Sequence, residues 1–187
     1  MKKLILIGIP SVGKSTLGKR LATALKLPFY DTDKMVCNEV KIAQPTDFFR
    51  LLFNGQISRA QRKACVELSI LQGAAVISTG AEVSLDPYCA RLIKEMGTII
   101  HIQRKPELAI EAIKKNTSAG IVKLNSDGTT NNMQEVMMKF YVQEMSQYEA
   151  LADYTLENNG TKKEGLKKLL ALLNREGIKP YCGNCYA

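Results

Sequence analysis

Residues 8–15, which read GIPSVGKS, have glycines, a lysine and a hydroxyl at the spacing that binds polyphosphate. Gly8 and Gly13 allow the positive φ angles and close backbone approach that let successive N–H groups point at phosphate oxygens. The helix expected after Gly13 would direct its N-terminal dipole at the same anion. Lys14 would bridge the β- and γ-phosphates, and the Ser15 hydroxyl would ligate Mg²⁺. The motif therefore predicts a binding site for a nucleoside triphosphate.

Two aspartates follow the next apolar segment, in the run FYDTD at residues 29–33. Alternate residues of an extended segment point the same way, so we expect Asp31 and Asp33 both to face the γ-phosphate. One carboxylate would assist Mg²⁺, and the other would hold an acceptor hydroxyl and take its proton. The alternative is that the pair only caps the following helix. The first interpretation favours a kinase over a nucleotide switch or a motor, which a phosphate loop alone does not separate.

Short apolar runs alternate with amphipathic stretches, which indicates βαβ units and a parallel sheet with helices on both faces. The expected strands cover residues 4–9, 28–30, 74–78, 98–102 and 154–156. The expected helices cover residues 14–26, 34–41, 59–72, 86–95, 106–115, 133–151 and 162–174. Residues 116–132 are rich in Asn, Ser, Thr and Gly, which is typical of a mobile lid or of a disordered surface insertion. The class expected is therefore α/β.

The composition restricts the class of protein further. Apolar residues make up 45% of the chain and charged residues 24%, which excludes wholesale disorder and a fibrous repeat. No apolar run approaches the roughly 20 residues that cross a bilayer, so no membrane partner is expected. We also expect the protein to be cytoplasmic and a monomer. The net charge of +8 favours anionic ligands, but the basic residues are spread along the chain, and nucleic acid is not expected.

Several residues outside these motifs invite a functional interpretation. Cys182 and Cys185 form one C-x-x-C pair, which is at most half of a zinc site. The alternative is that the pair belongs to a C-terminal tail and has no role in binding. We expect the single histidine, His101, to be a core or edge residue of a strand rather than a catalyst. Arg104 and Lys105 are expected in solvent, just before the helix at residues 106–115, although either could contact an anion.

The segments at residues 8–16 and 29–33, at this separation and in a chain of this length, resemble shikimate kinase, in the nucleoside-monophosphate-kinase-like branch of P-loop folds. Thr79-Gly80 stands where that family has three glycines, and residues 148–153 (YEALAD) resemble its Tyr-Glu-x-x-Ala-Asp segment. The resemblance implies one P-loop kinase domain over residues 1–174 with a tail at 175–187. It implies three α/β/α layers with a five-stranded parallel sheet, an acceptor-binding helical region at about 34–72 and a mobile lid at about 116–132.

The implied activity is transfer of the γ-phosphoryl of ATP to a hydroxyl of a small metabolite, with shikimate, converted to shikimate 3-phosphate, as the first candidate. The resemblance implies that ATP is held by Gly8, Pro10, Ser11, Val12, Gly13, Lys14, Ser15 and Thr16. Lys14 would also act in catalysis. Ser15 would bind Mg²⁺ with assistance from Asp31.

On the acceptor side, the resemblance implies that Asp33 grips the substrate diol as candidate base and that Gly80 lines the substrate pocket. A gapless count back from Gly80 aligns Arg59 with the family's arginine that binds the substrate carboxylate. A guanidinium suits that role because it can donate two parallel hydrogen bonds to a carboxylate. The alternative for Arg59 is a solvated basic helix start beside Arg62 and Lys63.

Some positions that carry Gly or Arg in the family are occupied differently here. They are Ala81 and Glu82 in the glycine motif, Ala112 in the helix after the fourth strand, Ala119 in the lid and Glu144 before the tyrosine. Glu82 and Glu144 would repel an anionic acceptor. The alternatives are therefore a related kinase with a neutral or cationic acceptor, and a non-catalytic ATP-binding P-loop sensor. A nucleic-acid-associated protein is suggested only by the net charge.

Overall fold

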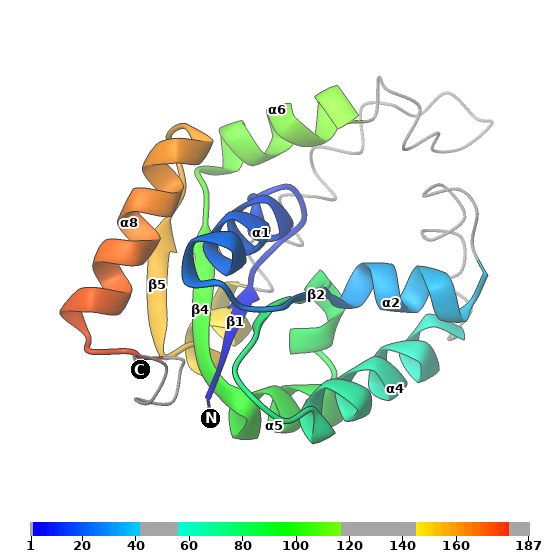
Figure 1. Cartoon of the computed structure of the whole chain (residues 1–187). Coiled ribbons are helices and arrows are strands. Elements are labelled where there is room, and N and C mark those ends of the chain that lie inside the picture. The colour runs from blue at the N-terminus through cyan, green and yellow to red at the C-terminus, as the bar shows by residue number, and fades with distance from the viewer. Residues whose placement is uncertain (1, 42–55, 117–144, 180–187) are drawn as a thin grey trace, which may run out of the picture.

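The computed structural model describes residues 2–41, 56–116 and 145–179, and Figure 1 shows how the elements are arranged. In chain order they are β1 (Lys3–Ile7), α1 (Lys14–Leu25), β2 (Phe29–Asp31), α2 (Thr32–Glu39), α4 (Gln56–Ile70), β3 (Val76–Ser78), the 3₁₀ turn η1 (Ala81–Ser84), α5 (Pro87–Met96), β4 (Gly97–Gln103), α6 (Pro106–Asn116), β5 (Tyr154–Glu157) and α8 (Lys162–Arg175). Residues 145–151 are also helical.

The five strands form one parallel sheet in the order β2-β3-β1-β4-β5. Helices α1 and α8 pack together on one side of the sheet. Helix α5 packs against β4, α4 packs against α5, and α2 contacts α4. The expected α/β/α architecture with a five-stranded parallel sheet is therefore confirmed. The central strand β1 lies between β3 and β4, so the loop that follows it opens at the carboxyl edge of the sheet, where such folds bind ligands.

Strand β1 forms the centre of the core because its side chains are apolar on both faces. Residues 4–7 have no exposed surface, and Ile5 pairs with Ile77 on β3 and with Ile99 on β4. This continuous apolar pattern, without polar alternation, is what a parallel strand covered by helices on both sides requires. Each such buried side chain contributes roughly 1.5–3 kcal/mol, so the strand that leads into the phosphate loop is rigidly held.

Two helices begin where the sequence supplies capping groups. The Asp86 carboxylate accepts hydrogen bonds from the N–H groups of Tyr88 (2.9 Å) and Cys89 (3.0 Å) at the start of α5. At the start of α8, Thr161 and Glu164 form a reciprocal capping box. The Thr161 N–H bonded to the Glu164 carboxylate lowers the pKa of that carboxyl. The position of this capping box matters, because Thr161 and Lys162 at the N-terminus of α8 line a cavity together with residues 10, 11 and 13–17.

Most element boundaries differ from the expected ones by a few residues. The first strand ends at Ile7 instead of residue 9, because the chain turns at Gly8, and α2 begins at Thr32 instead of residue 34. The turn η1 was not predicted. The segment at 117–144, which holds nearly all of the expected lid, and residues 180–187, with Cys182 and Cys185, lie outside the described residues. Of the helices that the structure describes, none combines the length and apolar character that crossing a membrane requires.

Candidate active site

The phosphate loop has the strand–loop–helix setting that its motif requires. Strand β1 leads into Gly8 (φ 138°), Ser11 adopts φ 62°, and Gly13 (φ 102°) is the N-terminal cap of α1. A Cβ on Gly8 would lie 2.5 Å from the carbonyl oxygen of Ile102 on β4, so a side chain does not fit there. The left-handed conformations at both glycines also disfavour any other residue. The loop is therefore shaped by backbone constraints that the glycines satisfy.

The Lys14 side chain curls back into the loop. Its Nζ donates hydrogen bonds to the carbonyl oxygens of Gly8 (2.6 Å) and Ile9 (2.8 Å), and the residue is only 7% exposed. The ammonium group is thus already desolvated and fixed at the centre of the loop. A phosphate entering the loop would meet a preorganised positive charge there.

A cavity of about 550 Å³ opens in front of the loop. With two exceptions, the residues expected to hold ATP line this cavity. The exceptions are Gly8 and Val12, and the side chain of Val12 is fully buried. Beyond the loop, the lining includes Asp33 and the N-terminal residues of α8, Thr161 and Lys162. The cavity therefore joins the phosphate loop, the acidic segment and the start of the last helix.

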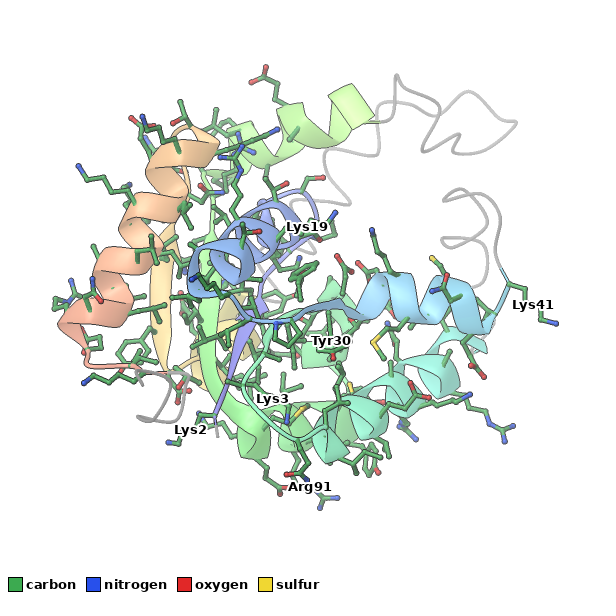
Figure 2. The ribbon with its side chains drawn as sticks, in the orientation of Figure 1. Lys2, Lys3, Lys19, Tyr30, Lys41 and Arg91 are labelled. Carbon is green, nitrogen blue, oxygen red and sulfur yellow. The ribbon has the colours of Figure 1, made fainter. Side chains whose placement is uncertain are left out.

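Among the described residues, few side chains bring positive charge to the cavity, although the whole chain is basic. Lys14, Arg104 and Lys162 line the cavity. In contrast, Lys19 on α1 and Arg91 on α5 are exposed, and Figure 2 shows them well apart, with Arg91 at the lower edge of the view. The cations that face the cavity are therefore the ones that can act on a bound anion.

The two aspartates do not share an extended segment, so the geometry expected for them is wrong. Strand β2 ends at Asp31 and helix α2 begins at Thr32, which places Asp33 in the first helical turn. Asp33 lines the cavity, whereas Asp31 is 7% exposed and lies at the N-cap position without a capping hydrogen bond from its side chain. Capping by Asp31, the alternative explanation, is therefore not what the structure displays.

Burial and nearby charges together raise the pKa of Asp33. Burial raises the pKa of Asp33, the nearby Lys14 ammonium lowers it, and the Asp31 carboxylate raises it again, with burial the largest effect and a net increase. Asp31, Asp33 and Lys14 thus interact electrostatically even though the aspartates belong to different elements. A group with a raised pKa at the edge of a phosphate cavity is a candidate proton acceptor.

A cluster of oxygen ligands lies beside this acidic pair. The Ser15 hydroxyl is 3.3 Å from the hydroxyl of Ser78, which is 1% exposed at the end of β3. Asp31 is the register partner of Ser78 across the β2–β3 pair. Ser78, a residue that the sequence pattern did not single out, thus contacts one of the two residues expected to bind magnesium, Ser15, and lies next to the other, Asp31, in the sheet register.

Gly80 lies directly against Asp33. Its N–H donates to the Thr32 hydroxyl at 2.7 Å, and a Cβ built on Gly80 would collide with the Asp33 carboxylate. Thr32 is 1% exposed, so this hydrogen bond fixes the turn after β3 against the start of α2. The structure thus brings together two of the three expected acceptor residues, Asp33 and Gly80.

The third expected acceptor residue, Arg59, is exposed on α4, and the structure shows no hydrogen bond or ion pair between it and the described residues. The neighbouring Arg62 instead pairs with Asp86 at 2.8 Å. Among the departures from the family pattern, Glu82 is partly buried in η1, and Ala112 lies on α6. Ala119 and Glu144 lie outside the described residues.

Two residues near the loop were missed or misplaced by the sequence interpretation. Arg104, expected in solvent, is partly buried, lines the cavity and donates from Nη1 to the Ser11 carbonyl at 3.4 Å. Asn158 is 8% exposed, and its amide Nδ2 donates to the Val12 carbonyl at 2.7 Å. Asn158 follows β5 in an Asn-Asn-Gly run, which signals a turn but not a contact with a loop far away in the sequence.

A parallel sheet that presents a phosphate loop, with a carboxylate of raised pKa at the edge of the same cavity, defines a P-loop phosphotransferase. The model of the shikimate kinase family matches residues 10–174, and the chain belongs to that family. It is accordingly an ATP-dependent small-molecule kinase, as the segments at residues 8–16 and 29–33 predicted. The family assignment supports phosphorylation of shikimate.

Individual relatives agree with this assignment. The shikimate kinase of Francisella tularensis subsp. novicida is 27% identical over 179 residues, which cover 95% of this chain and 97% of that protein. That of Thermoanaerobacter pseudethanolicus is 28% identical over 159 residues, covering 84% and 86%. The structure of shikimate kinase from Acinetobacter baumannii in complex with shikimate superimposes with a TM-score of 0.80 at 19% identity, covering 96% of each chain, which shows a common fold.

Proposed function

We propose that this chain transfers the γ-phosphoryl group of ATP to a hydroxyl of shikimate, giving ADP and shikimate 3-phosphate. The observation that carries the proposal is the position of Asp33, which lines the phosphate cavity and lies against Gly80. An acceptor hydroxyl placed between this carboxylate and the phosphate loop would be close to both reacting groups. The Acinetobacter baumannii relative, whose structure contains shikimate, supports this choice of acceptor.

In the proposed reaction, the loop backbone and Lys14 hold the triphosphate. Asp33 accepts a hydrogen bond from the acceptor hydroxyl and takes its proton as the new O–P bond forms and the bond to the ADP oxygen breaks. The raised pKa of Asp33 suits a base that must return the proton after each turnover. Lys14 stabilises the charge that spreads over the transferred group, with Arg104 as a second cation at the cavity.

The oxygen ligands around Ser15 fit a magnesium ion. The hydroxyls of Ser15 and Ser78 and the carboxylate of Asp31 are hard donors, and a cation beside them would offset the repulsion between Asp31 and Asp33. In the described part of the chain, no cluster of three or more His, Cys, Asp or Glu side chains could hold a metal. Such a sparse set is normal for Mg²⁺, which is bound together with nucleotide phosphates and neutralises their charge.

Arg59 remains our proposal for binding the acceptor carboxylate, on the strength of the resemblance and of guanidinium chemistry. Its exposure on α4 leaves the guanidinium accessible to a ligand. Glu82, which follows Gly80 and Ala81, is the observation that favours a second candidate, a related kinase with a neutral or cationic acceptor. A carboxylate in this turn would repel an anionic substrate.

The test is release of ADP from Mg·ATP with shikimate and with a panel of polyols and cyclic hydroxy acids. We expect shikimate to give the highest kcat/KM and a product whose phosphate is on a ring oxygen, identified by ³¹P NMR. A higher kcat/KM for a neutral polyol would favour the second candidate. Binding of ATP by calorimetry without turnover of any acceptor would contradict a kinase and indicate a nucleotide sensor.

A further inference from the structure

Tyr148 connects the helix at residues 145–151 to the turn that carries Gly80. The side chain is completely buried, and its hydroxyl donates a hydrogen bond to the carbonyl oxygen of Ala81 at 3.1 Å. Ala81 begins η1 directly after Gly80, and we call residues 80–84 the acceptor turn. The hydroxyl of Tyr148 therefore holds the backbone of the acceptor turn one residue away from the glycine that contacts Asp33.

The ring of the same tyrosine packs against His101 on β4. The two ring centroids are 5.1 Å apart with planes inclined by 36°, and His101 is 1% exposed. His101 also lies against the first residue of the phosphate loop, because a Cβ on Gly8 would be 3.4 Å from its Cδ2 atom. The contacts thus run without interruption from Ala81 through Tyr148 and His101 to Gly8.

His101 is a neutral member of this series. Burial and the nearby Lys14 ammonium lower its pKa from 6.5 to about 4, so the imidazole carries no charge at neutral pH. It therefore fills the space under the loop without adding a second cation beside Lys14. Its position in a buried strand, paired with Ile7 of β1, also limits its freedom to move.

We propose that Tyr148 and His101 are positioning residues that couple the acceptor turn to the phosphate loop. The inference rests on the proposed function, because it assigns these two elements to the two substrates. Phosphoryl transfer needs the attacking oxygen and the γ-phosphate to be held in line within a fraction of an ångström. The packed rings of Tyr148 and His101 fix the position of the acceptor turn relative to the phosphate loop. Binding of the acceptor therefore changes the affinity for the nucleotide, and the reverse also holds.

The first experiment measures how shikimate changes the affinity for ADP, by calorimetry, in the wild type, Tyr148→Phe and Tyr154→Phe. The control removes a hydroxyl from a tyrosine on β5 that also packs against the core. We expect shikimate to tighten ADP binding by about fivefold or more in the wild type and in Tyr154→Phe. In Tyr148→Phe the factor should fall below about twofold, while the affinity for ADP alone stays within about threefold, because the ring remains in place.

Turnover provides a second measure of the same role. We expect Tyr148→Phe to lower kcat by about tenfold with little change in KM for ATP, since positioning matters most in the transition state. A merely structural tyrosine would lower the melting temperature and leave both the coupling and kcat unchanged. Retention of full coupling in Tyr148→Phe, or an equal loss in Tyr154→Phe, would overturn the proposal.

The single histidine offers a direct spectroscopic probe, because all imidazole signals in a ¹H–¹³C NMR spectrum, from the Cδ2–H and Cε1–H groups, belong to His101. Shikimate without nucleotide should shift the His101 signal in the wild type and leave it unchanged in Tyr148→Phe. A shift of equal size in both would show that the signal does not pass through the hydroxyl of Tyr148, and the proposal would fail.

Failure of the proposed function can be distinguished from failure of this inference. If the wild type binds ADP but neither binds nor phosphorylates shikimate, the proposed function is wrong. Amide hydrogen exchange of the ligand-free protein then tests whether Tyr148 and His101 couple the acceptor turn to the phosphate loop. Tyr148→Phe should accelerate exchange in residues 8–13 as well as in 80–84, and Tyr154→Phe in neither. Unchanged exchange in residues 8–13 would overturn the coupling.

Discussion

The phosphate side and the acceptor side of this active site are built in different ways. The phosphate side is centred on one continuous segment, residues 8–16, with backbone N–H groups, two glycines at positive φ, and Lys14. Arg104 and Asn158 contact this segment from distant elements. The proposed acceptor side is assembled from separate segments, with Asp33 on α2, Gly80 after β3, and Tyr148 on a third element that supports the turn. Binding of ATP is therefore encoded mainly by neighbouring residues, whereas recognition of the acceptor depends on how distant segments pack.

The largest effect should come from the phosphate side. We expect Lys14→Ala to lower kcat/KM by about 10³-fold, because it removes the only cation that the structure places inside the loop among the described residues. It also leaves the carbonyls of Gly8 and Ile9 without their donor. Steady-state kinetics and ADP calorimetry measure both consequences. Lys19→Ala on the exposed face of α1 is the matched control, and an equal loss there would show that charge in general, not the loop, is responsible.

The variant Asp33→Asn should affect turnover and leave binding of ATP nearly unchanged. Turnover should fall by about 10²-fold through loss of the base, while the affinity for ATP changes little. Because the folded state raises the pKa of Asp33, the ionised carboxylate destabilises the fold at neutral pH, and the stabilising effect of the protonated form is lost as pH rises through the raised pKa. Asp33→Asn should therefore melt at a higher temperature than the wild type at pH 7. An unchanged kcat would contradict its role as base.

The proposed role of Arg59 can be tested against its neighbour on the same helix. Arg59→Met should raise KM for shikimate by about tenfold and leave KM for ATP unchanged, since a charged hydrogen bond contributes about 1.5–3 kcal/mol. Arg62→Met is the matched control, because that guanidinium pairs with Asp86. Equal KM values for shikimate in the wild type and Arg59→Met would move the carboxylate-binding role to another residue.

The smallest effect concerns stability and not turnover. Because the pKa of His101 is lowered to about 4, the unfolded chain takes up a proton below its ordinary value of 6.5 before the folded one does. Stability should therefore fall as pH decreases from about 6.5 to 4, by up to about 3 kcal/mol from this group. Urea unfolding across that range should show a shallower decline in His101→Phe, and parallel curves for both proteins would contradict a lowered pKa.

The sequence predicted those parts of the site that depend on neighbouring residues. Apolar runs without alternation predicted the parallel sheet, and the glycine spacing predicted the loop, because backbone conformation is fixed locally at Gly8 and Gly13. The geometry expected at Asp31 and Asp33 was wrong because helix α2 begins between them, at Thr32, which nothing in the pattern FYDTD indicates.

Contacts between distant segments could not be predicted. Arg104 lies over Ser11, and Tyr148 reaches Ala81, only because the sheet order places β4 beside β1 and brings the helix at 145–151 close to η1. A gapless count along the sequence placed Arg59 on the acceptor side, but counting gives no direction for a side chain. Periodicity and motif spacing carry no information on such pairings.

The hydrogen bond from Asn158 to the Val12 carbonyl has a consequence for synthesis of the protein on the ribosome. The two residues are separated by 146 positions, so the phosphate loop leaves the exit tunnel long before the side chain that supports it. A nascent chain that ends before β5 has the nucleotide motif but not its support. We therefore expect ATP to stabilise this protein as a ligand only once β5 has joined the sheet and the Asn158 amide can reach the loop.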